Sequence, residues 1–364
     1  MDDAFKNASA MGDITLFYYN INKKDDTKDA YATALGGSLK YTTDSSKSVF
    51  ASATFHNSTP IFKHENKNLT KLFNNDNNAD ALTVLSESFL AYKTEDTILK
   101  AGNFFLNTPL INKSSSRIIP WSYQGATFVV NDIYKSSFQL SYINKMRNNT
   151  TDSYTNESLD GEFNNITIFG FKHHPIEQLD VHLYYYYVPS LYDSSFFQVD
   201  YKNHLKNSDM LFCLGFQHYK TFDDSDLYKD VDLLGFRTGI FTDNLDITLN
   251  YTNNRGDSKA SGYGGLSKIY TISMISNGRG ADKAKTWMLK TNLEFEMISK
   301  HSSEFSIWLA NIKSDTSEHN SYYTHFRHNT NNFTKIYLRY EYEDYKQNNA
   351  KDAHYLRFIT SYEF

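Results

Sequence analysis

Residues 99–130 have the sequence LKAGNFFLNTPLINKSSSRIIPWSYQGATFVV. Both flanks are short apolar runs that predict strands, and segment 106–122 between them predicts a loop. This loop contains Pro109 and Pro120, two of the five prolines in the chain. Because the pyrrolidine ring fixes φ, the loop is stiffer than the other long connecting segments, which are rich in Asn, Asp, Ser and Lys.

The same loop carries large apolar side chains, which a loop exposed to water does not need. We therefore expect 106–122 to fold inward, into the mouth of a barrel, and to narrow it. That packing would carry Lys113 and Arg117 into the lumen. The apolar residues are Leu106, Leu110, Ile111, Ile118, Ile119 and Trp121.

The amino-acid composition is typical of a barrel with a water-filled interior. Of 364 residues, 16% are aromatic, with 28 Tyr and 27 Phe, whereas only 40% are hydrophobic. The mean hydropathy is −0.57. Aromatic girdles combined with polar alternation are typical of outer-membrane barrels. No shift in composition divides the chain, so we expect a single domain over 1–364.

Several classes of protein are disfavoured. The net charge of −5 argues against a nucleic-acid partner. No apolar run reaches 18 residues, so the sequence offers no transmembrane helix. The single Cys213 excludes an intrachain disulfide, and neither a cysteine-based zinc site nor an HExxH motif is present. We expect no cofactor.

Apolar and polar residues alternate along most of the chain, as in Leu245, Ile247, Leu249 and Tyr251 with polar residues between them. A period of two is that of a strand with one apolar and one polar face. We predict eighteen strands, near 13–22, 29–41, 48–56, 83–93, 97–105, 123–132, 136–146, 162–171, 179–188, 192–203, 209–220, 231–240, 245–253, 285–297, 304–313, 321–328, 333–342 and 353–364.

Short and long connections between these strands alternate. The fold class predicted is therefore all-β, a transmembrane antiparallel β-barrel with short periplasmic turns and long extracellular loops. An even strand count places both termini in the periplasm, with 1–12 preceding the first strand. A soluble sandwich also has alternating strands. The apolar faces here, however, end in aromatics suited to a headgroup belt, at Tyr251, Tyr342 and Tyr362.

The final strand has aromatic residues at alternate positions and stops on Phe364, which resembles the C-terminal signature of bacterial outer-membrane proteins. At the other end, Met1 precedes Asp2-Asp3-Ala4-Phe5, a sequence similar to a mature start. We expect that a signal peptide is already absent from this chain.

Several motifs together resemble the OprD-like porins of epsilon-class proteobacteria. They are DAFKN at 3–7, GDITLFY at 12–18, Gly102, Pro109, SRIIP at 116–120, Gly125, the segment 235–250, RGD at 255–257 and the strand near Trp287. The resemblance implies an 18-stranded channel in the outer membrane of a Gram-negative bacterium, in contact with lipid and lipopolysaccharide, as a monomer or homotrimer. It also implies passage of small hydrophilic solutes and ions, often carboxylate-bearing nutrients, through a constriction lined by basic residues.

Charged residues on polar strand faces are candidates for that constriction, because a charge facing lipid is costly. Acidic and basic residues are interleaved, so the alternative is that they pair and merely satisfy one another. Arg117 is the leading candidate, since a planar guanidinium grips a carboxylate. With Lys113 and Arg117 of loop 106–122 added to the strand residues, the full set is Lys100, Lys113, Arg117, Arg237, Lys290, Glu294, Glu296, Arg339, Glu341 and Arg357.

Other functions remain open from the sequence. A barrel-wall hydrolase needs a serine next to a histidine, and His182, His218 and His325 lie on predicted strands. A surface adhesin barrel would use its long loops to bind a partner. Asp223, Asp224 and Asp226 form a weak Ca²⁺ candidate without EF-hand spacing. We interpret the glycine-rich stretch 261–265 as a flexible loop, and we expect Lys259 in the long loop 254–284 to have no effect on ion preference or channel width.

Overall fold

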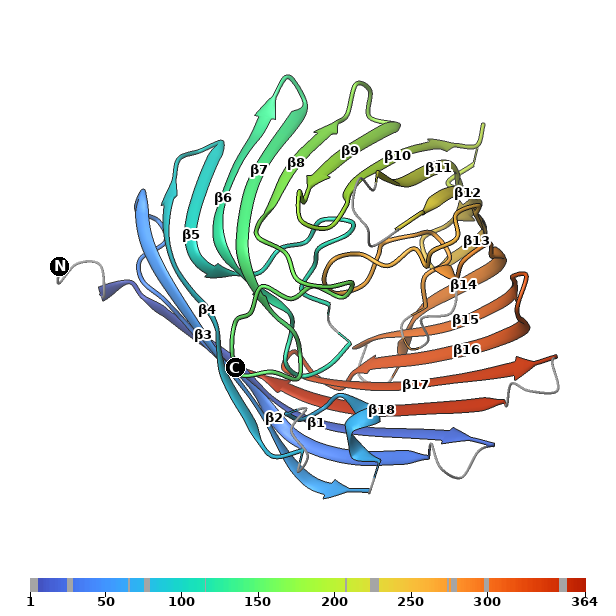
Figure 1. The fold of residues 1–364 in the computed structure, drawn as a ribbon, viewed down its shortest axis with the longest axis horizontal. Coiled ribbons are helices and arrows are strands. Elements are labelled where there is room, and N and C mark those ends of the chain that lie inside the picture. The colour runs from blue at the N-terminus through green and yellow to red at the C-terminus, as the bar shows by residue number, and fades with distance from the viewer. Residues whose placement is uncertain are drawn as a thin grey trace.

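The structure is a computed structural model that describes residues 6–24, 29–64, 66–74, 79–114, 116–206, 208–222, 229–273, 275, 280–297, 301–346 and 352–364. Within these residues, eighteen antiparallel strands follow one another around a ring, and β18 pairs with β1 to close it (Figure 1). The predicted fold class is confirmed.

Each predicted strand has a counterpart in the structure. The bounds are β1 Ser9–Lys23, β2 Ala30–Thr42, β3 Val49–Lys63, β4 Leu82–Lys93, β5 Thr97–Phe104, β6 Ser122–Ile133, β7 Ser136–Arg147, β8 Ile166–His173, β9 Leu179–Tyr187, β10 Asp193–His204, β11 Leu211–Phe222, β12 Asp232–Phe241, β13 Leu245–Asn254, β14 Lys285–Met297, β15 His301–Lys313, β16 Glu318–Asn329, β17 Thr334–Tyr345 and β18 Ala353–Glu363.

The alternation of the sequence separates two faces of the wall. Large apolar side chains such as Leu140, Leu249 and Trp287 are exposed on the outside, where lipid covers them. The residues between them point into the barrel, among them buried Thr248 and Asn250. Tyrosine and tryptophan gather toward strand ends, as at the Tyr251–Trp287 pair, whose ring centroids lie 4.4 Å apart.

Both termini lie at the end of the barrel with the short turns. Gly12 and Phe364 exchange two backbone hydrogen bonds of 2.9 Å, and the connections at this end include 94–96, 134–135 and 242–244. β1 already begins at Ser9, so 9–12 belong to the wall and not to the segment predicted to precede it. The additional ladder bonds explain the difference, because they satisfy backbone groups that hydrocarbon would leave unpaired.

Two glycines position the loop that follows β5. Gly102 and Gly125 face each other across β5 and β6, with φ of 128° and 155°. A Cβ at Gly125 would lie 1.9 Å from the carbonyl oxygen of Tyr142. Only glycine allows this approach. The pairing of β6 with β7 has a register irregularity between Gln124 and Gly125, close to the ends of β5 and β6 that loop 105–121 connects.

The interior of the barrel is occupied by loops. Figure 1 shows the teal segment after β5 and the orange segment after β13 inside the ring of strands. They belong to an apolar cluster that includes inward-facing residues of β8–β12, such as Ile168, Tyr184, Phe196, Tyr219 and Leu233. No helix in the described ranges is both long and apolar enough to cross a membrane.

Leu140→Arg tests the assignment of the two faces. Leu140 is 46% exposed on the outer wall, where a midplane arginine costs about 2–4 kcal/mol. We expect guanidinium unfolding in phospholipid vesicles to report a loss of that size. Gln139→Arg, one residue away on the inner face, is the matched control and should cost clearly less. Equal losses would contradict the assignment.

Candidate functional site

Loop 105–121 folds back into the barrel as a compact hairpin. Thr108 bonds to the carbonyl of Ile111 through its backbone N–H (2.9 Å), and Lys113 N–H bonds to the carbonyl of Leu106 (2.9 Å). Leu110 and Ile111 are fully buried. The buried apolar residues thus face the protein interior, as their burial free energy requires.

Loop 255–284 crosses the interior and pairs with this hairpin. The N–H of Tyr263 donates to the carbonyl of Leu110 (2.9 Å), and the N–H of Asn112 to the carbonyl of Gly264 (3.1 Å). A Cβ at Gly262 would lie 2.2 Å from the Leu110 oxygen. The interpretation of 261–265 as a free, flexible loop is wrong, because these glycines permit close backbone packing.

The far side of loop 255–284 is anchored to the wall. Tyr270 Oη donates to Asp200 on β10 (2.8 Å), and Ser273 Oγ donates to Glu341 on β17 (2.7 Å). Glu341 also accepts from Ser321 Oγ (2.6 Å) and is fully buried. Glu341 therefore serves as an acceptor that holds the loop to the wall.

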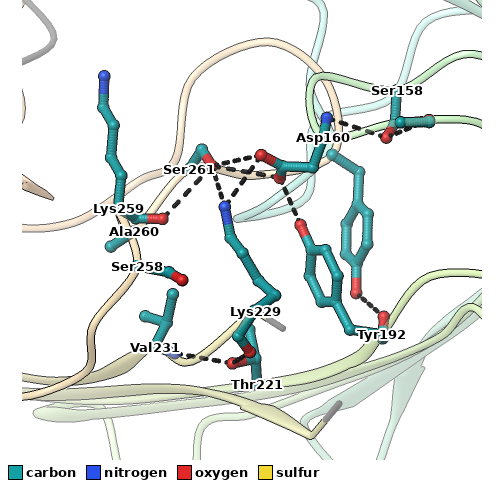
Figure 2. Close-up of polar contacts among 12 residues, drawn as sticks. Ser158, Asp160, Tyr192, Thr221, Lys229, Val231, Ser258, Lys259, Ala260 and Ser261 are labelled. Carbon is teal, nitrogen blue, oxygen red and sulfur yellow. Dashed lines mark hydrogen bonds and ion pairs between the residues drawn. The ribbon is translucent and has the colours of Figure 1, made fainter. Parts of the chain in front are cut away.

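Three other loops meet loop 255–284 at the carboxylate of Asp160 (Figure 2). It forms an ion pair with Lys229 (2.9 Å) and accepts from Tyr192 Oη (2.5 Å) and Ser261 Oγ (3.2 Å). Lys229 Nζ also donates to Ser261 Oγ (2.9 Å). The side chains of Asp160 and Lys229 are 21% and 12% exposed, so water screens this cluster only in part.

Arg117 lies between loop 105–121 and the wall. Its Nε donates to the carbonyl of Thr70 (2.7 Å) in the short helix η2, Lys67–Thr70, and its Nη1 to Ser116 (2.7 Å). Its Cζ lies 5.0 Å from the ring centroid of Tyr19. Burial, and then the neighbouring guanidinium of Arg357, lowers the pKa of Arg117 to about 9, so the group remains a cation at neutral pH.

A pocket of about 260 Å³ is lined by Arg117, by Arg339 of β17 and by Asp13 of β1. No carboxylate pairs with Arg117 or Arg339 in the described residues, and the Nε of Arg339 is buried without a hydrogen bond. Asp13 already accepts from Thr15 Oγ1 (2.7 Å) and from Ser38 Oγ. The positive potential of the pocket is therefore only partly balanced.

Lys113 faces a second, larger pocket of about 600 Å³ near the end with the short turns. Lys40 and Glu87 line it as an ion pair of 3.3 Å, and Asp13 lies between the two pockets. Lys113 itself is exposed. Loop 105–121 thus presents two basic side chains toward one section of the wall, β17, β18 and β1–β4.

The other predicted site residues lie elsewhere. Arg237 forms an ion pair with Asp200 (2.5 Å) beneath Tyr270. Lys290 donates to the Tyr270 carbonyl (2.8 Å), and Lys100 lies over the Phe89 ring at 4.9 Å. Glu294 and Glu296 are exposed toward the end of β14. The structure therefore brings together Arg117, Arg339 and Arg357, with Lys113 in the adjoining pocket.

Within the described residues, the structure does not assemble a hydrolase site or a calcium site from the predicted candidates. His218 bonds to Asp232 (3.0 Å) and His325 lies 3.9 Å from Glu304, while neither they nor His182 bonds to a serine within the described residues. Asp223, Asp224 and Asp226 lie outside the described residues. Among those described, no three His, Cys, Asp or Glu side chains gather as a metal site.

A closed eighteen-stranded barrel with an apolar outer wall and a charged interior defines an outer-membrane channel. The sequence profile described as "outer membrane porin, OprD family" matches residues 62–363. The chain belongs to the OprD family of outer-membrane porins, channels for small solutes in the Gram-negative outer membrane. No curated protein matches in the sequence search.

Solved structures have the same fold at low sequence identity. OccAB2 of Acinetobacter baumannii superposes with a TM-score of 0.88 at 15% identity, over 100% of this chain and 99% of that one. OccK8 (OprE) of Pseudomonas aeruginosa gives 0.81 at 13%, over 99% of each chain. The outer membrane protein opdK from Pseudomonas aeruginosa gives 0.81 at 13%, over 98% of each.

Sequence reasoning missed the residues that hold the site together. Tyr19 has the alternation of an ordinary strand residue, and Asp160 lies in an unremarkable polar loop. Both act through partners distant in sequence, Arg117 and Arg357 for Tyr19, and Lys229 for Asp160. A single sequence gives no signal for such contacts.

Asp160→Asn tests the anchoring of loop 255–284. The amide keeps the shape but removes the charge that binds three donors, which costs about 1–3 kcal/mol. We expect excursions of the loop, seen as open-channel current noise in planar bilayers, to become roughly ten times more frequent. Asp152→Asn, the same charge change in the same connection between β7 and β8, should leave the noise unchanged. Quiet currents from Asp160→Asn would show that the loop is held by its other contacts.

Proposed function

We propose that this porin passes small hydrophilic anions, carboxylate-bearing nutrients in particular, by passive diffusion through a constriction set by loop 105–121. The observation that carries the proposal is the pocket where Arg117 meets Arg339 without a carboxylate partner in the described residues. Two guanidinium groups whose charge is only partly balanced attract an anion at a narrowing. Water is scarce there, so each charge acts through a lower effective dielectric constant.

The proposed path runs along one side of the barrel. The inner faces of β8–β12 are covered by the apolar cluster around Leu110 and Tyr263. The pockets that contain Arg117 and Lys113 instead adjoin β17, β18 and β1–β4. We assign the constriction to these two pockets, and Arg237 and Lys290 to the support of loop 255–284.

Acidic residues on the lumenal side of the wall support a second part of this proposal, the orientation of solutes that carry both charges. Glu294 and Glu296 are exposed near the C-terminal end of β14, and Glu304 on β15 forms an ion pair with Arg327 (2.8 Å). An acidic section of wall at β14 and β15, in the same part of the barrel as the arginines of β17 and β18, gives a field perpendicular to the path. A solute with separated charges, such as an amino acid, would be oriented by that field.

We propose no catalytic turnover. Ser261 and Lys229 are the pair that most resembles a nucleophile and its base, with 2.9 Å between Oγ and Nζ. Lys229 is also in an ion pair with Asp160, and an ammonium held this way has no lone pair for proton abstraction. An adhesin needs no basic constriction. The epsilon-proteobacterial type, contact with lipopolysaccharide and the choice between monomer and homotrimer stay predictions from the resemblance.

Arg117→Ala is the direct test of the constriction. Removing the guanidinium should widen the channel and shift the reversal potential in a KCl gradient toward potassium permeability. Lys259 is not a suitable comparison, because its loop crosses the barrel. Lys47→Ala, in the exposed turn between β2 and β3, removes the same charge at a residue that lines neither pocket and should have no effect. Wild-type conductance and reversal potential from Arg117→Ala would place the loop outside the conducting path.

A further inference from the structure

The hydrogen-bonded ladder of the wall is interrupted beyond the end of β5. The ladder between β4 and β5 ends at the Ser88–Asn103 pair. β5 stops at Phe104, whereas β4 begins at Leu82. Among the described strands, none pairs with the part of β4 from Leu82 to Glu87 on the side of β5. Polar backbone groups on such an open edge need other partners.

Two side chains bridge this interruption. Arg147, the last residue of β7, is 1% exposed. Its Nη2 donates to Ser86 Oγ on β4 (3.2 Å) and to the carbonyl of Pro120 (2.9 Å). Tyr154, from the connection between β7 and β8, donates from Oη to the carbonyl of Ser86 (3.0 Å). The Tyr154 hydroxyl also lies 2.9 Å from Oγ of Ser122, the first residue of β6. Arg147 and Tyr154 thus join β4 to the start of β6.

The other arm of the Arg147 guanidinium reaches the connection between β7 and β8. Its Nη1 donates to the carbonyls of Asn148 (2.8 Å) and Thr151 (3.2 Å). One planar group therefore holds Pro120 on one side and the connection on the other. A lysine ammonium has a single nitrogen, which cannot occupy both positions.

Ser86 is the extra residue of a β-bulge, since β3 pairs with Glu87 and then with Leu85 and skips it. Strict alternation would place Ser86 and Glu87 on opposite faces of the wall. Both are buried instead, at 0% and 4% exposure, and Glu87 lines the larger pocket. Bulges re-aim side chains in this way. Arg147 and Tyr154 therefore bind the residue whose insertion turns Glu87 toward the lumen.

We infer that Arg147 is a positioning residue for the constriction, which fixes the point where loop 105–121 returns to the wall. Pro120 lies three positions after Arg117, so the carbonyl that Arg147 holds fixes the end of the segment that carries the proposed constriction residue. The inference rests on the constriction proposed for loop 105–121, and not on its preference for anions. Arg147 lines neither pocket and acts on the solute only through the loop.

Arg147→Lys separates the fork from the charge. It keeps a cation but loses the simultaneous hold on Pro120 and on the connection between β7 and β8. We expect excursions of loop 105–121, seen as open-channel current noise in planar bilayers, to become about ten times more frequent. The mean conductance should rise, because the constriction is held less firmly. Arg147→Gln, which loses both fork and charge, should behave in the same way.

Arg255→Lys is the matched control. It is the same exchange at a half-exposed guanidinium that pairs with Asp232 (2.6 Å) and lines neither pocket, so conductance and noise should stay at wild-type values. The mobility difference between unheated and boiled protein on SDS gels reports folding of each variant. If Arg147→Lys does not fold, Tyr154→Phe decides. It removes only the hydroxyl that donates to Ser86, and we expect about threefold more frequent excursions.

Three results would overturn the inference, and they differ. Wild-type conductance and noise from folded Arg147→Lys and Tyr154→Phe channels would remove the positioning role alone, while a changed current from Arg117→Ala would leave the constriction intact. Wild-type currents from Arg117→Ala would remove the constriction and the positioning role with it. A change in Arg147→Gln but not in Arg147→Lys would give Arg147 an electrostatic role in place of a positioning one.

Discussion

Hydrocarbon offers no hydrogen bonds to the backbone, and the rest of the structure depends on this constraint. Every peptide group at membrane depth must find its partner in a neighbouring strand, so the sheet must close. The β1–β18 ladder from Asp13–Glu363 to Lys23–Ala353 completes that closure. Closure with eighteen strands leaves a wide interior, which in barrels of this size forms an aqueous channel unless the chain itself fills it.

Two loops fill most of that interior, by opposite means. Loop 105–121 uses apolar side chains, including Leu110 and Ile111, that burial draws into the barrel. Loop 255–284 uses glycine for close backbone approach and polar anchors on distant strands, including Asp200 and Glu341. The remaining space lies beside β17, β18 and β1, where the guanidinium of Arg117 is held by the carbonyls of Thr70 and Ser116 and by the ring of Tyr19. We propose that selectivity follows from which side of the barrel the loops leave open.

The strands and the family could be predicted from the sequence because their signal is local. The alternation of apolar and polar residues with a period of two predicted all eighteen strands. The proline-containing, apolar segment 106–122 predicted a loop that folds into the barrel. The site was predicted only in part. Arg117, Arg339 and Arg357 do lie together, whereas Arg237 is paired with Asp200 and Lys290 bonds to a loop carbonyl. Loop 255–284 was misinterpreted because its packing depends on Leu110 and Tyr186, far away in sequence.

Reaction of engineered cysteines with a bulky methanethiosulfonate during single-channel recording tests the one-sided path most directly. Ser361 lines both pockets beside the arginines, whereas Gln217 faces the barrel interior from β11 beneath loop 255–284 and is 1% exposed. The native Cys213 is fully buried, which keeps the background low. The account predicts that Ser361→Cys reacts and the current falls, while Gln217→Cys stays unreactive. A current that falls on reaction at position 217 but not at 361 would contradict it.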